Sequence, residues 1–211
     1  MFIYYKTKEN MTINNSISKY DWQYILSASL LISVFILTDF IGVINKEYFY
    51  FVPRLISDQP YRIFTSILVH ADLNHLLSNI GGIIITRYFL MKLGIKSRYF
   101  YLKFILICSF LSFFIIWVYE KTLSYFLNFY PNYAALGFSG IIYALFGFLL
   151  LTSFYGKSHF LGKKIGLESN YKVQKMSKTI CLIGLIFSFL PGVSLLGHLS
   201  GFIAGCFLFL I

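Results

Sequence analysis

Long runs of apolar residues recur along the whole chain, and they constrain its fold more than any other feature. The 211 residues are 58% hydrophobic and only 12% charged, with a mean hydropathy of +0.73. Soluble domains carry roughly 25% charged residues, about twice this share. A run of about 18 apolar residues is long enough to cross a bilayer as a helix. The sequence therefore predicts an all-α, polytopic membrane protein surrounded by a lipid bilayer.

The apolar runs divide into six predicted transmembrane helices. Pro191 and Gly192 separate the last two, because both residues favour turns over helix interiors. Residues 1–23 are polar and form a predicted cytoplasmic tail, and residues 24–211 form one six-helix transmembrane domain. The predicted spans are residues 24–44, 73–91, 100–119, 138–155, 176–190 and 193–211.

The basic residues predict which ends of the helices face the cytoplasm. The net charge is +10, which could indicate a nucleic-acid partner. The cations, however, gather in the tail and in the loops after the second and fourth predicted spans, whereas the loops after the third and fifth carry no net charge. Because positive charge marks the cytoplasmic side, both termini are predicted to be cytoplasmic and no nucleic-acid partner is expected. The loop after the first span is mixed in charge.

Four polar residues of the predicted spans lie at a common depth. His75 and Asn79 are four residues apart near the outer end of the second span, so they share one helix face. Ser139 begins the fourth span at its outer end, and His198 lies near the outer end of the sixth. Polar side chains inside a span are costly and usually face the bundle interior or a water-filled cavity. Their common depth therefore indicates one polar site near the outer face.

The sixth predicted span carries a stripe of small residues on the face of its histidine. Gly201 and Gly205 follow His198 at three and seven residues, which places all three on one side of the helix. Small residues allow two membrane helices to approach closely. If the neighbouring helix is the fourth span, Ser139 and His198 can come into contact.

Each of these residues also has a purely structural explanation. Ser139 lies between Gly137 and Gly140, a pattern that is common where membrane helices pack closely. Gly137 equally permits a backbone conformation that would expose Ser139 at the start of a helix. His70 is predicted to lie in the loop before the second span and to support it, with Asp72 as the N-cap of that span.

Three motifs, in the expected order and on the expected spans, resemble those of the rhomboid family of intramembrane serine proteases. The resemblance covers roughly residues 22–211. The motifs are PYRIFTSILVHADLNHLLSN at 60–79, with His70, His75 and Asn79 in a His-x4-His-x3-Asn pattern; GFSG at 137–140, followed by Tyr143; and GHLSGFIAG at 197–205, a His-x2-Gly-x3-Gly pattern.

The resemblance implies that Ser139 is a nucleophile and His198 its general base, as a dyad without a carboxylate. It implies that His75 and Asn79, with the backbone N–H of Ser139, line an oxyanion hole. Tyr143 would pack against the His198 ring.

The resemblance further implies that Arg62 braces the first loop. The substrates would be transmembrane segments of other proteins, cut near the outer face, with no cofactor or metal required. One departure is the segment RYFLMKLG at 87–94, where many members carry a glutamate. Its absence leaves open how that helix end is held.

Other protease classes fit less well. Ile141 stands where a Gly-x-Ser-x-Gly elbow needs glycine, and no His-Glu-x-x-His zinc motif is present. Asp39 is an acid in the first span, but no second buried acid in another span accompanies it. An inactive rhomboid-like protein that binds membrane clients is the main alternative, although such proteins typically lack the serine or the histidine.

The oligomeric state is left open by the sequence. The short basic tail and the lack of a targeting peptide favour a prokaryotic plasma membrane.

Overall fold

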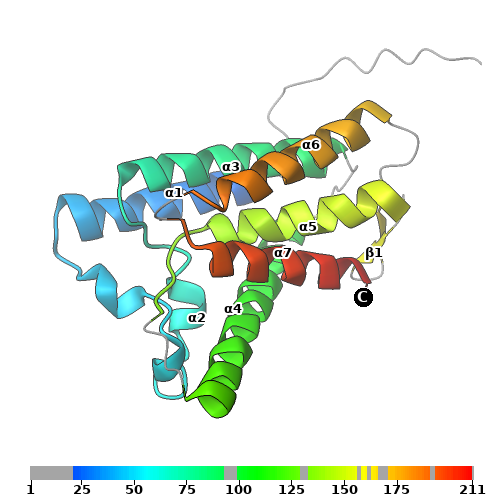
Figure 1. The fold of residues 1–211 in the computed structure, drawn as a ribbon. Helices are drawn as coiled ribbons and strands as arrows, with labels where there is room; N and C mark the ends of the chain where they lie inside the picture. Colours follow the sequence, from blue (N-terminus) through cyan, green and yellow to red (C-terminus); the bar gives the residue numbers. More distant parts are fainter. Residues whose placement is uncertain are drawn as a thin grey trace, which may run out of the picture.

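The computed structural model describes residues 21–92, 99–128, 133–155, 158–160, 163–165, 171–190 and 193–210. Within these ranges each predicted span contains one long helix (Figure 1). The turn predicted at Pro191 and Gly192, most of the tail, and Ile211 lie outside the described residues. The long helices are α1 (Trp22–Phe35), α3 (Leu73–Lys92), α4 (Phe100–Leu127), α5 (Ser139–Tyr155), α6 (Tyr171–Phe187) and α7 (Leu195–Leu210).

Shorter elements occupy the connections. A π-helical turn, η1 (Ile36–Phe40), continues α1, and the first loop contains the 3-10 turns η2 (Lys46–Phe49) and η3 (Pro53–Leu55) and the short helix α2 (Arg62–Thr65). Strands β1 (Ser158–Phe160) and β2 (Lys163–Ile165) pair antiparallel. The all-α expectation therefore holds for the bundle, with one small hairpin that the sequence did not reveal.

Two helices are longer than predicted. α4 continues past residue 119 to Leu127 and ends at Asn128, whose φ of 47° is left-handed. No proline or glycine lies between residue 119 and that point, so nothing interrupts the helix earlier. The extra turns project beyond the other helices (Figure 1). α6 begins at Tyr171, five residues before its predicted start at 176.

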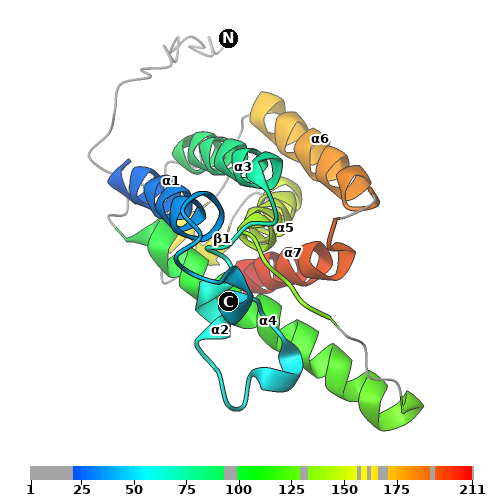
Figure 2. The ribbon, with the colours of Figure 1, turned by 90° about the vertical axis from the view of Figure 1, so that its left-hand side faces the viewer.

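α5 is the central helix of the bundle. It contacts α3, α4, α6 and α7, which surround it in the end-on view (Figure 2). All residues from Ile141 to Leu149 are buried. A helix that is apolar on every side is stable only when neighbours cover every side, which explains this position.

The closest helix contact joins α5 to α7. A Cβ atom added to Gly201 would overlap the carbonyl oxygen of Gly140, and one added to Gly205 would overlap that of Ala144. On α5, Gly147 is pressed in the same way against the Phe202 carbonyl of α7. The predicted small-residue stripe therefore brings the two backbones into direct contact.

The helix ends opposite the start of α5 are held by side chains from α1. Asp21 is buried and forms a two-pronged ion pair with Arg87 of α3, with nitrogen–oxygen distances of 2.9 and 2.7 Å. The Gln23 side chain accepts the backbone N–H of Tyr101, at 3.2 Å, near the start of α4. The carboxylate of Asp21, the N-cap of α1, thus pairs with Arg87 in the segment RYFLMKLG, which contains no acid of its own.

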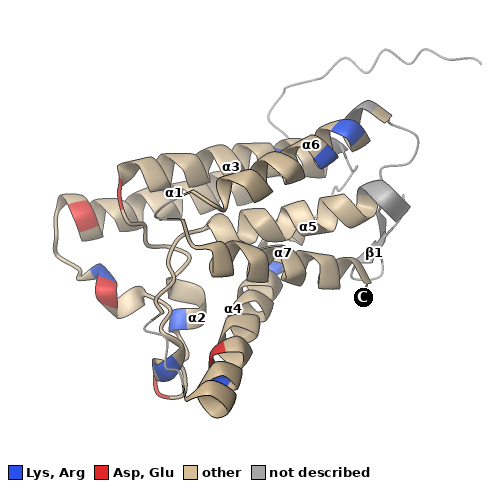
Figure 3. Ribbon diagram, viewed as in Figure 1, with Lys and Arg blue, Asp and Glu red and all other residues tan. Residues whose placement is uncertain are grey.

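Charge and length fit a membrane protein. The basic residues of α6 lie in its first half, and this helix begins at the end of the bundle opposite the start of α5 (Figure 3). Among the described helices, Trp22–Phe40 and Phe100–Leu127 are long and apolar enough to cross a membrane, and α5 and α7 contribute shorter apolar stretches.

The glycine contact between α5 and α7 predicts an asymmetry between two glycine substitutions. Gly205→Ala should lower the free energy of unfolding by about 1–3 kcal/mol or more, because the added methyl overlaps the Ala144 backbone. Gly81→Ala on α3 is the control, since no atom lies within 4 Å of its added methyl. It should be neutral or slightly stabilising. Thermal unfolding in detergent, followed by circular dichroism, measures both, and equal midpoints would contradict the contact.

Candidate active site

Ser139 is the first residue of α5, so the unpaired backbone N–H groups of a helix start surround its side chain. The residue is half-buried. It lines a small cavity of about 20 Å³ together with Ser112 of α4 and Ser194 and Gly197 at the start of α7. About 10–15 Å³ is enough for one water molecule. The serine therefore has room beside it for one small polar molecule.

Gly137 places the segment before α5 directly against α3. Its φ is +99°, a conformation that other residues rarely adopt. Its N–H donates to the Ser66 carbonyl at 2.9 Å. An added Cβ would lie 2.6 Å from Nε2 of His75 and 3.4 Å from Nδ2 of Asn79. Both the positive φ and the lack of space for a Cβ require glycine here. The two predicted oxyanion donors, His75 and Asn79, therefore lie beside Gly137, two residues before Ser139 in the chain.

Asn79 is 2% exposed, and its Nδ2 has no hydrogen-bond partner among the described residues. Buried donors are nearly always paired, so an unpaired one requires an explanation. His75 offers a second donor to the same region. Its Nδ1 accepts the Ala71 N–H at 3.4 Å, which leaves the ring proton on Nε2, the nitrogen next to Gly137. Asp72 caps α3 as predicted, accepting the His75 backbone N–H at 2.8 Å.

The His198 ring is held on two sides. Tyr143 of α5 stacks on it with a centroid distance of 3.8 Å and an angle of 15° between the rings. The Tyr143 hydroxyl is fixed in turn by donating to the Gly184 carbonyl of α6 at 2.5 Å. Nδ1 of His198 lies 3.1 Å from Oγ of Ser188, near the end of α6. The imidazole therefore has a defined position and orientation.

The glycine contact brings the turns that carry Ser139 and His198 face to face. Gly140, the neighbour of Ser139, lies against Gly201, one turn after His198. A Cβ on Gly140 would also lie 3.6 Å from the Gly197 carbonyl oxygen, one residue before His198. The predicted serine and histidine thus lie at one junction of α5 and α7.

Arg62 is buried within the first loop. Its guanidinium donates to the carbonyls of Glu47 at 2.9 Å and Tyr50 at 2.6 Å, and to the Gln59 side chain at 2.5 Å. Phe51, which follows Tyr50, exchanges two backbone hydrogen bonds of 2.9 Å with Ala135, just before α5. The first loop is therefore tied to the segment that leads to Ser139.

His70 is fully buried in the loop before α3, edge-on to the His75 ring at a centroid distance of 5.1 Å. Burial, assisted by the neighbouring His75, lowers the pKa of His70 to about 4. The ring is therefore neutral at pH 7 and supports His75 by packing.

Asp39 lies on the surface, and its ion-pair partner Lys46 also donates to the carbonyls of His70 at 3.3 Å and Ala71 at 2.9 Å, in the loop before α3. Asp39 also accepts the Thr38 hydroxyl at 2.7 Å. Within the described residues no group of three or more His, Cys, Asp or Glu side chains could hold a metal ion.

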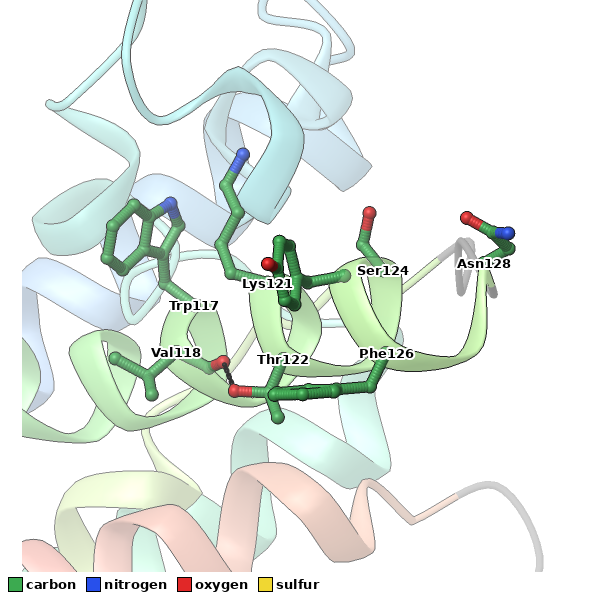
Figure 4. Close-up of a pocket in the computed structure, with 8 residues that line it drawn as sticks. Trp117, Val118, Lys121, Thr122, Ser124, Phe126 and Asn128 are labelled. Atoms are coloured by element: carbon green, nitrogen blue, oxygen red, sulfur yellow. Dashed lines mark hydrogen bonds between the residues drawn. The ribbon is translucent and has the colours of Figure 1, made fainter.

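A larger depression of about 710 Å³ lies at the projecting end of α4 (Figure 4). Among the residues shown in Figure 4, the Thr122 hydroxyl donates a hydrogen bond of 2.8 Å to the Val118 carbonyl of the same helix. It contains none of the predicted site residues. Its labelled lining residues are Trp117, Val118, Lys121, Thr122, Ser124, Phe126 and Asn128.

The sequence did not single out Ser188. Its one signal was its place as the last polar residue before the predicted turn at Pro191 and Gly192, which precedes the span of His198.

A rhomboid domain family model matches residues 57–211. That is most of the chain and includes all three motifs. The chain belongs to the rhomboid family. No curated protein is matched by the sequence.

Rhomboids are integral membrane proteins, and two of the described helical segments of this chain are long and apolar enough to cross a membrane. The family consists generally of intramembrane serine proteases that act on transmembrane substrates, with inactive rhomboid-like proteins besides.

Two effects disfavour a side chain at Gly137 of this rhomboid, the positive φ of its backbone and the closeness of the His75 side chain, and substitutions can separate them. Gly42 also has a positive φ, +71°, but no atom within 4 Å of an added Cβ. Gly42→Ala should therefore cost only the left-handed backbone strain, roughly 1–2 kcal/mol. Gly137→Ala should destabilise the protein more, because the methyl also meets His75. Thermal unfolding measures both, and in a His75→Ala background the excess should shrink. An unchanged excess would refute the contact.

Proposed function

We propose that this rhomboid is an intramembrane serine endopeptidase that cleaves transmembrane segments near the outer face with a Ser139–His198 dyad. One observation carries the proposal. The buried amide of Asn79, which has no partner in the described part of the chain, and the Nε2–H of His75 converge beside the start of α5, where Ser139 lies. Two hydrogen-bond donors aimed at one small space suit an acceptor that arrives with a substrate.

The reaction follows from these placements. His198 accepts the proton of the Ser139 hydroxyl as Oγ attacks the scissile carbonyl. The carbonyl oxygen becomes an anion and is stabilised by Asn79, His75 and the backbone N–H of Ser139. The imidazolium then gives its proton to the leaving amine, and one water molecule in the adjoining cavity hydrolyses the acyl-enzyme.

The supporting residues have roles in keeping with their contacts. Tyr143 orients His198 by stacking, and Gly137 gives the donors access to the serine. Arg62 stabilises the first loop, and His70 supports His75.

The membrane arrangement is part of the proposal. Residues 24–211 form a domain of six transmembrane helices, with both termini in the cytoplasm of a prokaryotic cell. The basic residues at the start of α6 then face the cytoplasm, and the starts of α3, α5 and α7 face outward. This places Ser139 and His198 near the outer face.

An inactive, client-binding rhomboid-like protein is the second candidate. It needs no nucleophile or base, whereas this chain keeps Ser139 and an oriented His198. A folded wild-type protein that neither reacts with a serine-directed reagent nor cleaves a substrate would favour it.

A fluorophosphonate probe tests the nucleophile directly. The wild type in detergent should be labelled, whereas Ser139→Ala should not be, and His198→Ala should be labelled far more slowly. Cleavage of a single-span reporter substrate should fall by about 10⁴-fold or more in both variants. Ser124→Ala, at the far end of α4, is the control and should behave as the wild type. Cleavage by Ser139→Ala would overturn the proposal.

Asn79→Ala tests the oxyanion site. Loss of one donor should lower kcat on the reporter by about 10²–10³-fold with little change in KM, because the oxyanion exists only after attack. Asn74→Ala on the same helix is the matched control, since Asn74 is exposed. If the Asn79 variant kept full kcat, the amide would be a packing residue only.

A further inference from the structure

Ser188 lies in the turn directly after α6. Among the described residues of α6 and this turn, only its side chain forms a hydrogen bond with the His198 ring. Its side chain is 3% exposed, and its Oγ lies 3.1 Å from Nδ1 of the imidazole. A hydroxyl can either donate to or accept from a histidine nitrogen. The role of Ser188 therefore depends on where its single proton lies.

The Gly184 carbonyl decides the direction of this hydrogen bond. Oγ of Ser188 donates to that oxygen at 3.1 Å, and the oxygen also accepts the Tyr143 hydroxyl at 2.5 Å and the Ser188 backbone N–H at 3.1 Å. In this arrangement the hydroxyl proton points at Gly184. This is the bond that helical serines commonly make to the carbonyl four residues earlier. The free lone pair of Oγ then faces His198, and Nδ1 must carry a proton to complete the contact. With that proton on Nδ1, a neutral imidazole has its lone pair on Nε2.

We propose that Ser188 is a positioning residue that holds His198 in the Nδ1–H tautomer, so that Nε2 is free to take the proton of Ser139. The neutral hydroxyl of Ser188 would orient the histidine through Nδ1, as the carboxylate does in a Ser-His-Asp triad. The inference rests on the proposed function and adds the residue that orients its base.

A neutral partner suits the surroundings of His198. Tyr143 covers one face of the ring, and His75 is the titratable residue that α3 contributes to its surroundings. On α4, the acid Glu120 interacts instead with Arg54 and Lys121.

A mostly apolar cavity borders the ring. This cavity of about 300 Å³ between α5, α6 and α7 is lined by Ser188 and His198, with Lys178 and Cys181 farther along it. No carboxylate borders this cavity in the described part of the chain. An ionised third residue would be costly in such an environment, whereas a hydroxyl paired with a carbonyl is not.

Ser188→Ala should lower kcat on the reporter by about 5- to 30-fold with KM unchanged, because one hydrogen bond to the base is lost. The acid limb of the pH–rate profile should move to lower pH, since the Ser188 oxygen also stabilises the imidazolium. A packing defect alone would lower the rate without moving the limb. Ser188→Thr keeps the hydroxyl and should restore both the rate and the limb.

Thr179→Ala is the matched control. Thr179 is exposed on α6 and makes the same kind of bond, to the Lys175 carbonyl at 2.9 Å, without facing the histidine. Its removal should change neither kcat nor the pH profile. An unshifted limb in Ser188→Ala, or a folded Ser188→Thr that is no better than alanine, would overturn the assignment.

The tautomer can be read without any activity. In protein labelled with ¹⁵N at histidine, the shifts of His198 should show a protonated Nδ1 in the wild type and a mixture of tautomers in Ser188→Ala, with a His198→Ala sample for assignment. A wild type with the proton on Nε2 would refute the inference even if Ser139 proves catalytic. A protonated Nδ1 in a protein without activity would support the hydrogen bond while the proposed function failed.

Discussion

The glycine contact between α5 and α7 is the constraint on which the rest of the structure depends. Where Gly201 and Gly205 meet the backbone of α5, no side chain separates the two helices. The helices can therefore neither slide nor rotate without overlap of backbone atoms. This fixes the height of His198 relative to Ser139, although neither residue takes part in the contact. Without it, the two residues would share a depth but have no fixed separation.

The site is assembled from helix starts, which are the most polar parts of an apolar bundle. α3, α5 and α7 each begin near it, and unpaired N–H groups at helix starts favour a developing negative charge. The first loop closes the arrangement, because Arg62 organises it and Phe51 pairs with Ala135 before α5. The ends of α1, α3 and α4 opposite the site are secured separately through Asp21 and Gln23.

The polar network around His198 is neutral throughout. Tyr143 and Ser188 both donate to one carbonyl, that of Gly184, and both contact the imidazole. A charged partner would bring a desolvation cost that an apolar bundle offsets poorly. Stacking on Tyr143 and the hydroxyl of Ser188 orient the His198 ring without that cost. The arrangement gives a physical reason why the proposed dyad would need no carboxylate.

The sequence by itself determined the elements and the candidate residues. Hydropathy located each long helix, because burial in an apolar medium requires continuous apolar runs, and spacing put His75 and Asn79 on one face. It missed the extension of α4 to Leu127 and the ion pair of Asp21, which hydropathy does not encode. Only the tertiary structure decided that Gly137 lies against His75 and that Ser188 meets His198. These contacts join separate helices, and their geometry follows from how the backbones pack rather than from any local pattern.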